Sequence, residues 1–205
     1  MSRQQLVLAS SSRYRRMLLE RLGAPFTVIV PEVAEAARAG ERPSATALRL
    51  AEAKARAVAE RCEEDALVIG SDQVADCGGV AVSKPADHPD AVRMLQSLSA
   101  RTIVWHTALA LVDVRSGSLQ SECVDVSSTF RTLSREQIDA YLAREQPYDC
   151  AGAVRSEALG IALFDRISSD DPTALIGLPL IALSRMLRNV GFDVLAPQAS
   201  RTART

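Results

Sequence analysis

The segment 6–23 constrains the fold most strongly, because it has the pattern of a buried strand that runs directly into a helix. An apolar stretch, Leu6–Ala9, is followed by three consecutive serines at 10–12. Apolar residues then recur at helical spacing, and a glycine stands where a helix C-cap belongs. These positions are Tyr14, Met17, Leu18, Leu22 and Gly23. The pattern predicts a strand–loop–helix unit, which is typical of an α/β fold.

The first turn of this predicted helix carries Arg13, Arg15 and Arg16. The helix dipole is positive at that end, so each cation there is disfavoured by a few tenths of a kcal/mol to about 1 kcal/mol. Serine hydroxyls, free backbone N–H groups and guanidinium groups that converge on one point suit a phosphate. The alternative is an ordinary strand–helix connection with solvated arginines, and this segment alone does not decide between the two.

Length, aromatic content and net charge limit the class of protein to which this chain can belong. The chain has 205 residues, enough for one large domain or two small lobes, and only 4% of them are aromatic. We therefore expect a core of Leu, Val, Ile and Ala. The net charge of −1 argues against a surface that binds a nucleic-acid polymer. With no apolar run of membrane-spanning length and no signal peptide, we expect a cytoplasmic protein without a membrane partner.

The four cysteines lie far apart in the sequence, at 62, 77, 123 and 150. They form no Cys-x-x-Cys pair or Cys/His cluster, so the sequence predicts buried free thiols in a reducing compartment rather than a structural zinc site. The two histidines, His88 and His106, give little support to a catalytic histidine. His88 precedes a proline at a predicted helix start, and His106 lies within a predicted strand.

The remaining elements follow from periodicity and end signals. We expect strands at 26–30, 66–69, 80–82, 102–114, 119–130 and 161–167. We expect helices at 45–62, 89–99 and 135–145, and a last helix that starts at 177–179 and ends at Gly191. Ser44 is the expected N-cap of the helix at 45–62, and Ser134 with Gln137 has the pattern of a capping box. The order predicts parallel strands at the start, an antiparallel pair in the middle, and one α/β domain over residues 1–195. The polar residues 196–205 are expected to form a disordered tail.

Charged residues recur at the predicted ends of these elements. Asp72 follows the buried strand 66–69, and the carboxyl end of such a strand is where open α/β sheets place their chemistry. Lys84 follows the return strand of a predicted hairpin, and the alternative is a surface hairpin with a neutralised Asp/Lys pair. Lys54 lies at the edge of a helical stripe, where a lysine is commonly solvated. Glu35 lies in the polar loop 32–42.

Together these residues supply what hydrolysis of a phosphate ester requires. A polyanionic phosphate needs several cations, and a Mg²⁺-type ion needs one or two carboxylates while substrate phosphates supply other ligands. Hydrolysis also needs a base that takes a proton from water. The sequence therefore predicts a site that binds and hydrolyses a phosphorylated substrate.

Six short motifs in this order resemble the Maf family of nucleoside triphosphate pyrophosphatases. They are LASSSRYRR at 8–16, RLAEAKA at 49–55, GSDQV at 70–74, KP at 84–85, CAGAVRSE at 150–157 and GLPL at 177–180. The resemblance covers nearly the whole chain, roughly residues 6–191. Each motif is weak alone, and the six in order are a specific signal.

The resemblance implies an elongated Maf/ITPase-like α/β domain, with a twisted mixed sheet, helices on both sides and two lobes around a central cleft. It implies a cytoplasmic homodimer that cleaves a nucleoside triphosphate between the α and β phosphates with a divalent cation, Mg²⁺, Mn²⁺ or Co²⁺. The implied catalytic residues are Asp72, Lys84 and Lys54. The implied phosphate-binding residues are Ser10, Arg15, Arg16, Lys54 and Lys84, and the implied metal ligands are Glu35 and Asp72.

Within the family, the sequence resembles the subgroup that acts on 7-methyl-GTP. The subgroup that acts on dTTP and UTP typically has threonine at the position of Gln73 and glutamine at the position of Glu157. We therefore expect Tyr14, Gln73 and Glu157 to recognise the base. The chemistry agrees, because 7-methylguanine is a cationic ring that stacks on an aromatic face, and a carboxylate accepts hydrogen bonds from the guanine N1 and N2 edge.

Three positions depart from the family pattern. Ala34 stands where an acid is usual, which weakens a two-carboxylate metal site in that loop, and Ser83 and Ala158 replace usual glycines. Three alternatives remain open at this stage. The chain could be a dTTP/UTP pyrophosphatase, a nucleotide-binding regulator of septum formation, or a structural domain whose basic residues are merely solvated.

Overall fold

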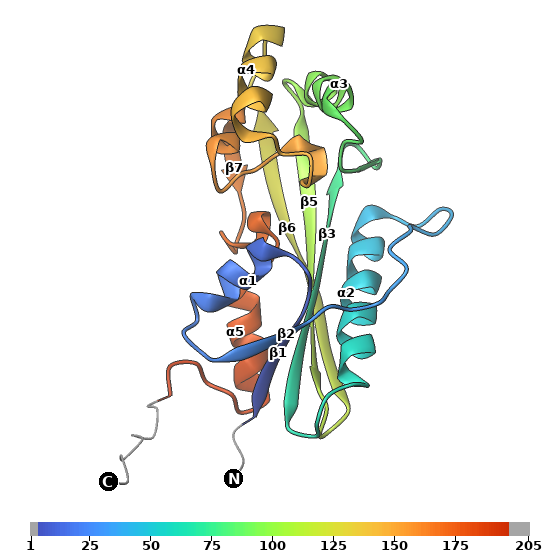
Figure 1. The fold of residues 1–205 in the computed structure, drawn as a ribbon, viewed down its shortest axis with the longest axis vertical. Helices are drawn as coiled ribbons and strands as arrows, with labels where there is room; N and C mark the ends of the chain where they lie inside the picture. Colours follow the sequence, from blue (N-terminus) through green and yellow to red (C-terminus); the bar gives the residue numbers. More distant parts are fainter. Residues whose placement is uncertain (1–3, 197–205) are drawn as a thin grey trace.

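The computed structural model describes residues 4–196. They form one elongated α/β domain built on a seven-stranded mixed sheet, with helices on both faces (Figure 1). The strands are β1 (Gln5–Ala9), β2 (Phe26–Ile29), β3 (Ala66–Asp76), β4 (Ala81–Val82), β5 (Thr102–Asp113), β6 (Ser118–Phe130) and β7 (Phe164–Ser168). The α-helices are α1 (Arg13–Glu20), α2 (Pro43–Ala59), α3 (His88–Leu98), α4 (Arg135–Glu145) and α5 (Leu180–Asn189). Three short 3₁₀ turns are η1 (Ala151–Ala153), η2 (Leu159–Leu163) and η3 (Ala174–Ile176). The predicted tail lies outside the described residues except for Ala196.

The sheet order is β2-β1-β3-β5-β6-β7, with β4 paired to β3. Strand β1 lies between β2 and β3 and is parallel to both, whereas β3, β5, β6 and β7 pair antiparallel. This confirms the predicted change from parallel pairing at the start of the chain to antiparallel pairing in its middle.

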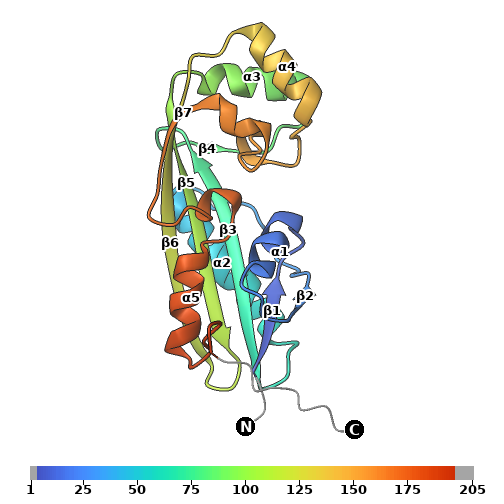
Figure 2. The same cartoon turned by 90° about the vertical axis from the view of Figure 1, so that its left-hand side faces the viewer.

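Side chains of the sheet alternate between two faces, and each face has its own helices. On one face, the strand residues Leu8, Ile69 and Leu109 pack against α1 and α5. On the other, strand residues such as Val7 and Val68 pack against α2. A third cluster, around Trp105 and Phe130, holds α3 and α4 on the far ends of β5 and β6. The long strands β3, β5 and β6 thus carry two lobes, as Figures 1 and 2 show.

Several predicted boundaries are wrong, including the following three. Strand β3 continues from Ala66 to Asp76, because β5 pairs with it along its whole length, so the polar residues after Ile69 belong to the ladder. Helix α2 begins at Pro43 and its N-cap is Arg42, so the predicted N-cap, Ser44, is wrong. Proline suits the first turn of a helix because the backbone N–H that it lacks would have no partner there. The last strand begins at Phe164, after η2.

Other local predictions are confirmed. The capping box of α4 is present, with the Ser134 side chain accepting from the Gln137 backbone and the Gln137 side chain accepting in return. All four cysteines are free thiols, although only Cys77 is buried. One apolar position of α1 differs from this pattern, because Met17 is 39% exposed. Within residues 4–196, no helix combines the length and the apolar composition needed to cross a membrane.

Candidate active site

A cleft of about 810 Å³ opens between the two lobes. Its walls come from the serine loop and the start of α1, from α2 and β3, from the hairpin that leads to Lys84, and from the segment around 149–157. The pairing of β1 with β3 ends at Ala9 and Gly70. Beyond that point β3 continues past the end of β1, and the cleft opens beside it. Asp72 lies within β3, two residues beyond this point, rather than at the end of a strand as predicted.

Lys54 and Asp72, which both line this cleft, form a buried ion pair. The Lys54 Nζ atom lies 2.6 Å from Asp72 Oδ1 and 2.5 Å from Glu35 Oε1. Lys54 is only 5% exposed, so it is not the solvated edge residue that its position in the helix suggested. Its hydrogen bond lowers the pKa of the Glu35 carboxyl below the usual range, and the charges of Lys54, Lys84 and Arg15 act in the same direction. Glu35 therefore stays ionised at neutral pH.

The Glu35 and Asp72 carboxylates fit a divalent cation of the Mg²⁺ or Mn²⁺ type. Both contact the same ammonium nitrogen, so these two oxygens are at most about 5 Å apart. Carboxylate oxygens are the ligands that such hard cations prefer, and such sites commonly use one or two carboxylates together with substrate phosphates. Ala34 has no donor to add to this set. The residues present are thus sufficient for a cation that shares its ligands with a phosphate.

The serine loop is held by its own hydroxyls. Ser10 is 3% exposed, and its Oγ accepts a hydrogen bond of 3.1 Å from the Ser12 backbone N–H. Ser12 caps α1, because its side chain accepts from the Arg15 backbone N–H. Arg15 Nε donates to the Gly177 carbonyl at 2.9 Å, and Ser71 Oγ of β3 donates to the same oxygen. Burial lowers the pKa of Arg15, and the carboxylates of Asp72 and Glu35 oppose that shift.

The structure does not bring all the predicted cations together. Arg15, Lys54 and Lys84 line the cleft. Arg16 does not line it: its side chain is 65% exposed, and its Nε lies 3.1 Å from Glu20 Oε1, one turn further along α1. The geometry therefore gives no support to Arg16 as a phosphate ligand. Arg13, which the sequence analysis did not select, lines the cleft instead.

The three residues predicted to recognise the base, Tyr14, Gln73 and Glu157, all line the cleft. Glu157 is exposed on its wall. The amide nitrogen of Gln73 donates to the carbonyl oxygens of Ala174 and Leu175, each at 3.0 Å. Gln73 thus holds η3 in place, and its carbonyl oxygen is the group that remains for a ligand.

Tyr14 connects the two lobes through a residue that the sequence analysis missed. Its hydroxyl oxygen accepts from Arg155 Nε at 3.0 Å and from Arg13 Nη2 at 2.6 Å, while the Arg13 guanidinium lies 4.7 Å from the centre of its ring. Arg155 also donates to the Glu145 carbonyl at 2.8 Å, which fixes it to the end of α4. The sequence signal for Arg155 was its place in the 150–157 motif, where only Glu157 was selected.

Comparisons with known proteins agree with the geometry. The Maf-like protein family matches residues 5–190. A protein of Burkholderia thailandensis named 7-methyl-GTP pyrophosphatase is 58% identical over 198 residues, covering 96% of this chain and 92% of the relative. A protein of the same name from Ralstonia nicotianae is 55% identical over 194 residues, covering 95% of this chain and 100% of the relative.

Among solved structures, a nucleoside-triphosphatase / dITP/XTP pyrophosphatase from Mycobacterium abscessus aligns at 16% identity with a TM-score of 0.40, covering 69% of this chain and 95% of that chain. A likeness this weak adds nothing to the fold described above. The family match and the close relatives span nearly all of the described residues, including every segment that lines the cleft. The chain therefore belongs to the Maf-like protein family.

Proposed function

We propose that this protein is a nucleoside triphosphate pyrophosphatase that hydrolyses 7-methyl-GTP to 7-methyl-GMP and diphosphate. The observation that carries the proposal is the buried Lys54, held between the carboxylates of Asp72 and Glu35 in a cleft that Arg15 and Lys84 also line. The substrate follows from the name that the close relatives carry and from the residues at the predicted base site.

In this proposal the triphosphate is bound by Arg15, Lys54 and Lys84, with Ser10 and the backbone N–H groups of the serine loop. Asp72 takes a proton from the attacking water or holds a divalent cation together with Glu35. Such a cation, Mg²⁺, Mn²⁺ or Co²⁺, neutralises charge on the phosphate oxygens when it is bound. Lys54 holds both carboxylates close together, and its hydrogen bond lowers the pKa of the Glu35 carboxyl.

Two neighbouring arginines of α1 test the phosphate site. We expect Arg15→Ala to lower kcat/KM for 7-methyl-GTP at least tenfold, because the loss of one charged hydrogen bond costs about 1.5–3 kcal/mol. Arg16→Ala removes the same charge outside the cleft and is expected to have a clearly smaller effect. Steady-state kinetics on the two variants measures both. Equal losses would show that the phosphate site extends to Arg16, as the sequence alone predicted.

The base site is tested by substrate preference. We expect kcat/KM to be higher for 7-methyl-GTP than for GTP, and far higher than for dTTP or UTP. A carboxylate at Glu157 would repel the carbonyl oxygens of thymine and uracil, whereas it pairs with the donor edge of guanine. The positive charge of 7-methylguanine adds attraction to Glu157 and to the Tyr14 ring, worth on the order of 1 kcal/mol in a partly dry pocket.

The variant Glu157→Gln should reduce the preference for 7-methyl-GTP over GTP while kcat for GTP stays within a fewfold of wild type. Glu136→Gln, on the exposed first turn of α4, is the matched control and should leave the preference unchanged. A clear preference of the wild-type protein for dTTP or UTP would refute the proposed substrate and leave the family assignment intact. No release of diphosphate from any of the four nucleotides would favour a nucleotide-binding regulator instead.

We also propose that the protein is a cytoplasmic homodimer. The proposal rests on the resemblance to the family described above. Light scattering of the purified protein would measure its mass, and a monomer at micromolar concentration would refute the dimer.

A further inference from the structure

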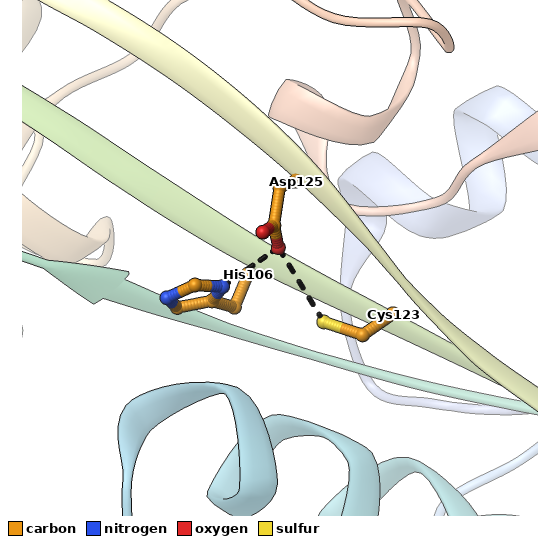
Figure 3. A group of neighbouring side chains, drawn as sticks. All are labelled: His106, Cys123 and Asp125. Carbon is orange, nitrogen blue, oxygen red and sulfur yellow. Dashed lines mark hydrogen bonds and ion pairs between the residues drawn. The ribbon is translucent and has the colours of Figure 1, made fainter.

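A second group of potential ligands lies on the sheet outside the cleft. His106 is on β5, and Cys123 and Asp125 are on β6 (Figure 3). One ligand atom of each residue lies within 4.8 Å of the other two. The register explains this proximity: His106 pairs directly with Asp125, and Cys123 is two residues along β6, so all three point from the same face. None of the three lines the cleft.

The histidine of this group is held at both ring nitrogens. Its Nδ1 atom lies 2.7 Å from Asp125 Oδ1, and its Nε2 atom lies 3.3 Å from Asp76 Oδ2 on β3. The Cys123 Sγ atom lies 3.8 Å from the same Asp125 oxygen. A metal-binding histidine characteristically donates its second ring N–H to a carboxylate, which fixes the orientation of the ring. Asp76 has that position here.

A cysteine nucleophile is the competing interpretation of these residues, and the contacts argue against it. Such a cysteine needs an adjacent base and a lowered pKa. The Cys123 Sγ atom contacts the Asp125 carboxylate rather than the imidazole. The group therefore lacks the electropositive surroundings that activate a thiol.

We propose that Cys123 Sγ, His106 Nδ1 and an oxygen of Asp125 bind a Zn²⁺ ion, with Asp76 as the outer carboxylate of His106. A thiolate, an imidazole and a carboxylate together are a typical zinc ligand set. Zinc bonds of about 2.0–2.3 Å place tetrahedral ligand atoms roughly 3.5 Å apart. Small side-chain adjustments from the observed positions therefore close the site, and a water completes the fourth position.

The sequence offered no sign of this site, because its ligands are 17 and 19 residues from His106 and only strand pairing brings them together. The site also differs in kind from the proposed catalytic cation site, whose ligands are two carboxylates. An ion here would join β5 to β6 directly and reach β3 through Asp76. Asp76 Oδ1 also accepts from the Gly79 N–H at 2.6 Å, so the bound ion would brace the turn of the hairpin that leads to Lys84.

Cobalt provides a direct test, because Co²⁺ bound to a thiolate has a sulfur-to-metal charge-transfer band that Co²⁺ bound to oxygen ligands lacks. We expect one equivalent of Co²⁺ to produce this band in the wild-type protein and Zn²⁺ to abolish it by displacement. The band should be lost in Cys123→Ala and retained in Cys62→Ala, where another half-buried free thiol is removed. It should also persist in Glu35→Gln, which alters only the cleft carboxylates. No thiolate band in the wild-type protein, or an unchanged band in Cys123→Ala, would overturn the proposal.

Calorimetric titration with Zn²⁺ tests the outer carboxylate. We expect Asp76→Asn to weaken zinc binding by about 10- to 100-fold, the usual cost of losing such a partner. Asparagine keeps an acceptor for the Gly79 N–H, so the hairpin is retained. Asp125→Ala, whose side chain is 61% exposed, removes a ligand without disturbing the core and should also weaken binding at least tenfold. Unchanged zinc affinity in both variants would overturn the site. None of these outcomes depends on pyrophosphatase activity, so they do not bear on the proposed function.

Discussion

Asp72→Asn is expected to lower kcat for 7-methyl-GTP by about two to four orders of magnitude. General acid–base catalysis by one side chain typically contributes that much. Asparagine has nearly the same shape as aspartate but carries no negative charge, so it can neither take a proton from water nor hold a divalent cation well. Because Asp72 is within β3 and pairs there with Ala108 of β5, its side chain is aimed by rigid structure.

The variant should remain folded. Removal of one partner from a buried ion pair commonly costs 3–5 kcal/mol, because the other charge is left unpaired. Here the Lys54 ammonium keeps its contact with Glu35, and the asparagine carbonyl can still accept from it. Circular dichroism would check the fold. Asp139→Asn, a half-exposed carboxylate on α4 outside the cleft, is the matched control and should change kcat less than twofold. A folded Asp72→Asn variant that turns over at near the wild-type rate would refute the assignment.

Metal titration separates the two roles proposed for Asp72. If Asp72 is mainly a ligand, Asp72→Asn should raise the Mg²⁺ concentration needed for half-maximal activity, and saturating Mg²⁺ should recover part of kcat. If Asp72 is mainly the base, kcat should remain low at every Mg²⁺ concentration. Glu35→Gln provides the comparison, because it removes the other carboxylate without touching the proposed base.

Local sequence signals predicted much of this fold because the elements are governed by local physics. The strand at 6–9, the serine turn and the helix that follows were predicted from apolar spacing, and the α4 capping box from Ser134 and Gln137. The predicted glycine cap is wrong, because the C-cap of α1 is Arg21 rather than Gly23. The boundaries that failed were decided by distant segments. β3 extends to Asp76 because β5, almost 30 residues later, supplies its partner strand.

In the candidate site, too, local sequence motifs predicted the residues, whereas contacts between distant segments could not be predicted. The motifs identified Lys54, Asp72 and Glu35, but their pairing depends on how α2 packs against β3, which no local pattern encodes. Gln73 looked like a residue that touches substrate, yet its amide nitrogen holds η3, a segment 100 residues away in the chain. Arg155 was missed because its contact with Tyr14 joins two lobes. Side-chain partners across such distances become visible only once the sheet is assembled.

The packing of α2 against β3 predicts the second large effect, which is that Gly70→Ala should destabilise the protein and remove activity together. A Cβ atom at Gly70 would lie 2.3 Å from the Ala51 carbonyl oxygen and 2.7 Å from the Ala55 backbone nitrogen. Backbone atoms of a helix cannot rotate away, so the whole helix must move from the strand. Overpacking typically costs 1–3 kcal/mol and occasionally more, and we expect at least about 3 kcal/mol here.

Activity should fall with stability because the same helix carries Lys54 to Asp72. Denaturant unfolding and 7-methyl-GTP turnover measure the two effects. Gly117→Ala is the control: its Cβ would meet open space, and its positive φ of 69° should cost about 1 kcal/mol of stability without loss of kcat. A second control places Gly70→Ala in an Ala55→Gly background. That removes the Ala55 Cβ contact at 2.8 Å but leaves the backbone clashes, so it should restore little stability. Full recovery would mean that side chains, rather than the backbone of α2, set the spacing between Lys54 and Asp72.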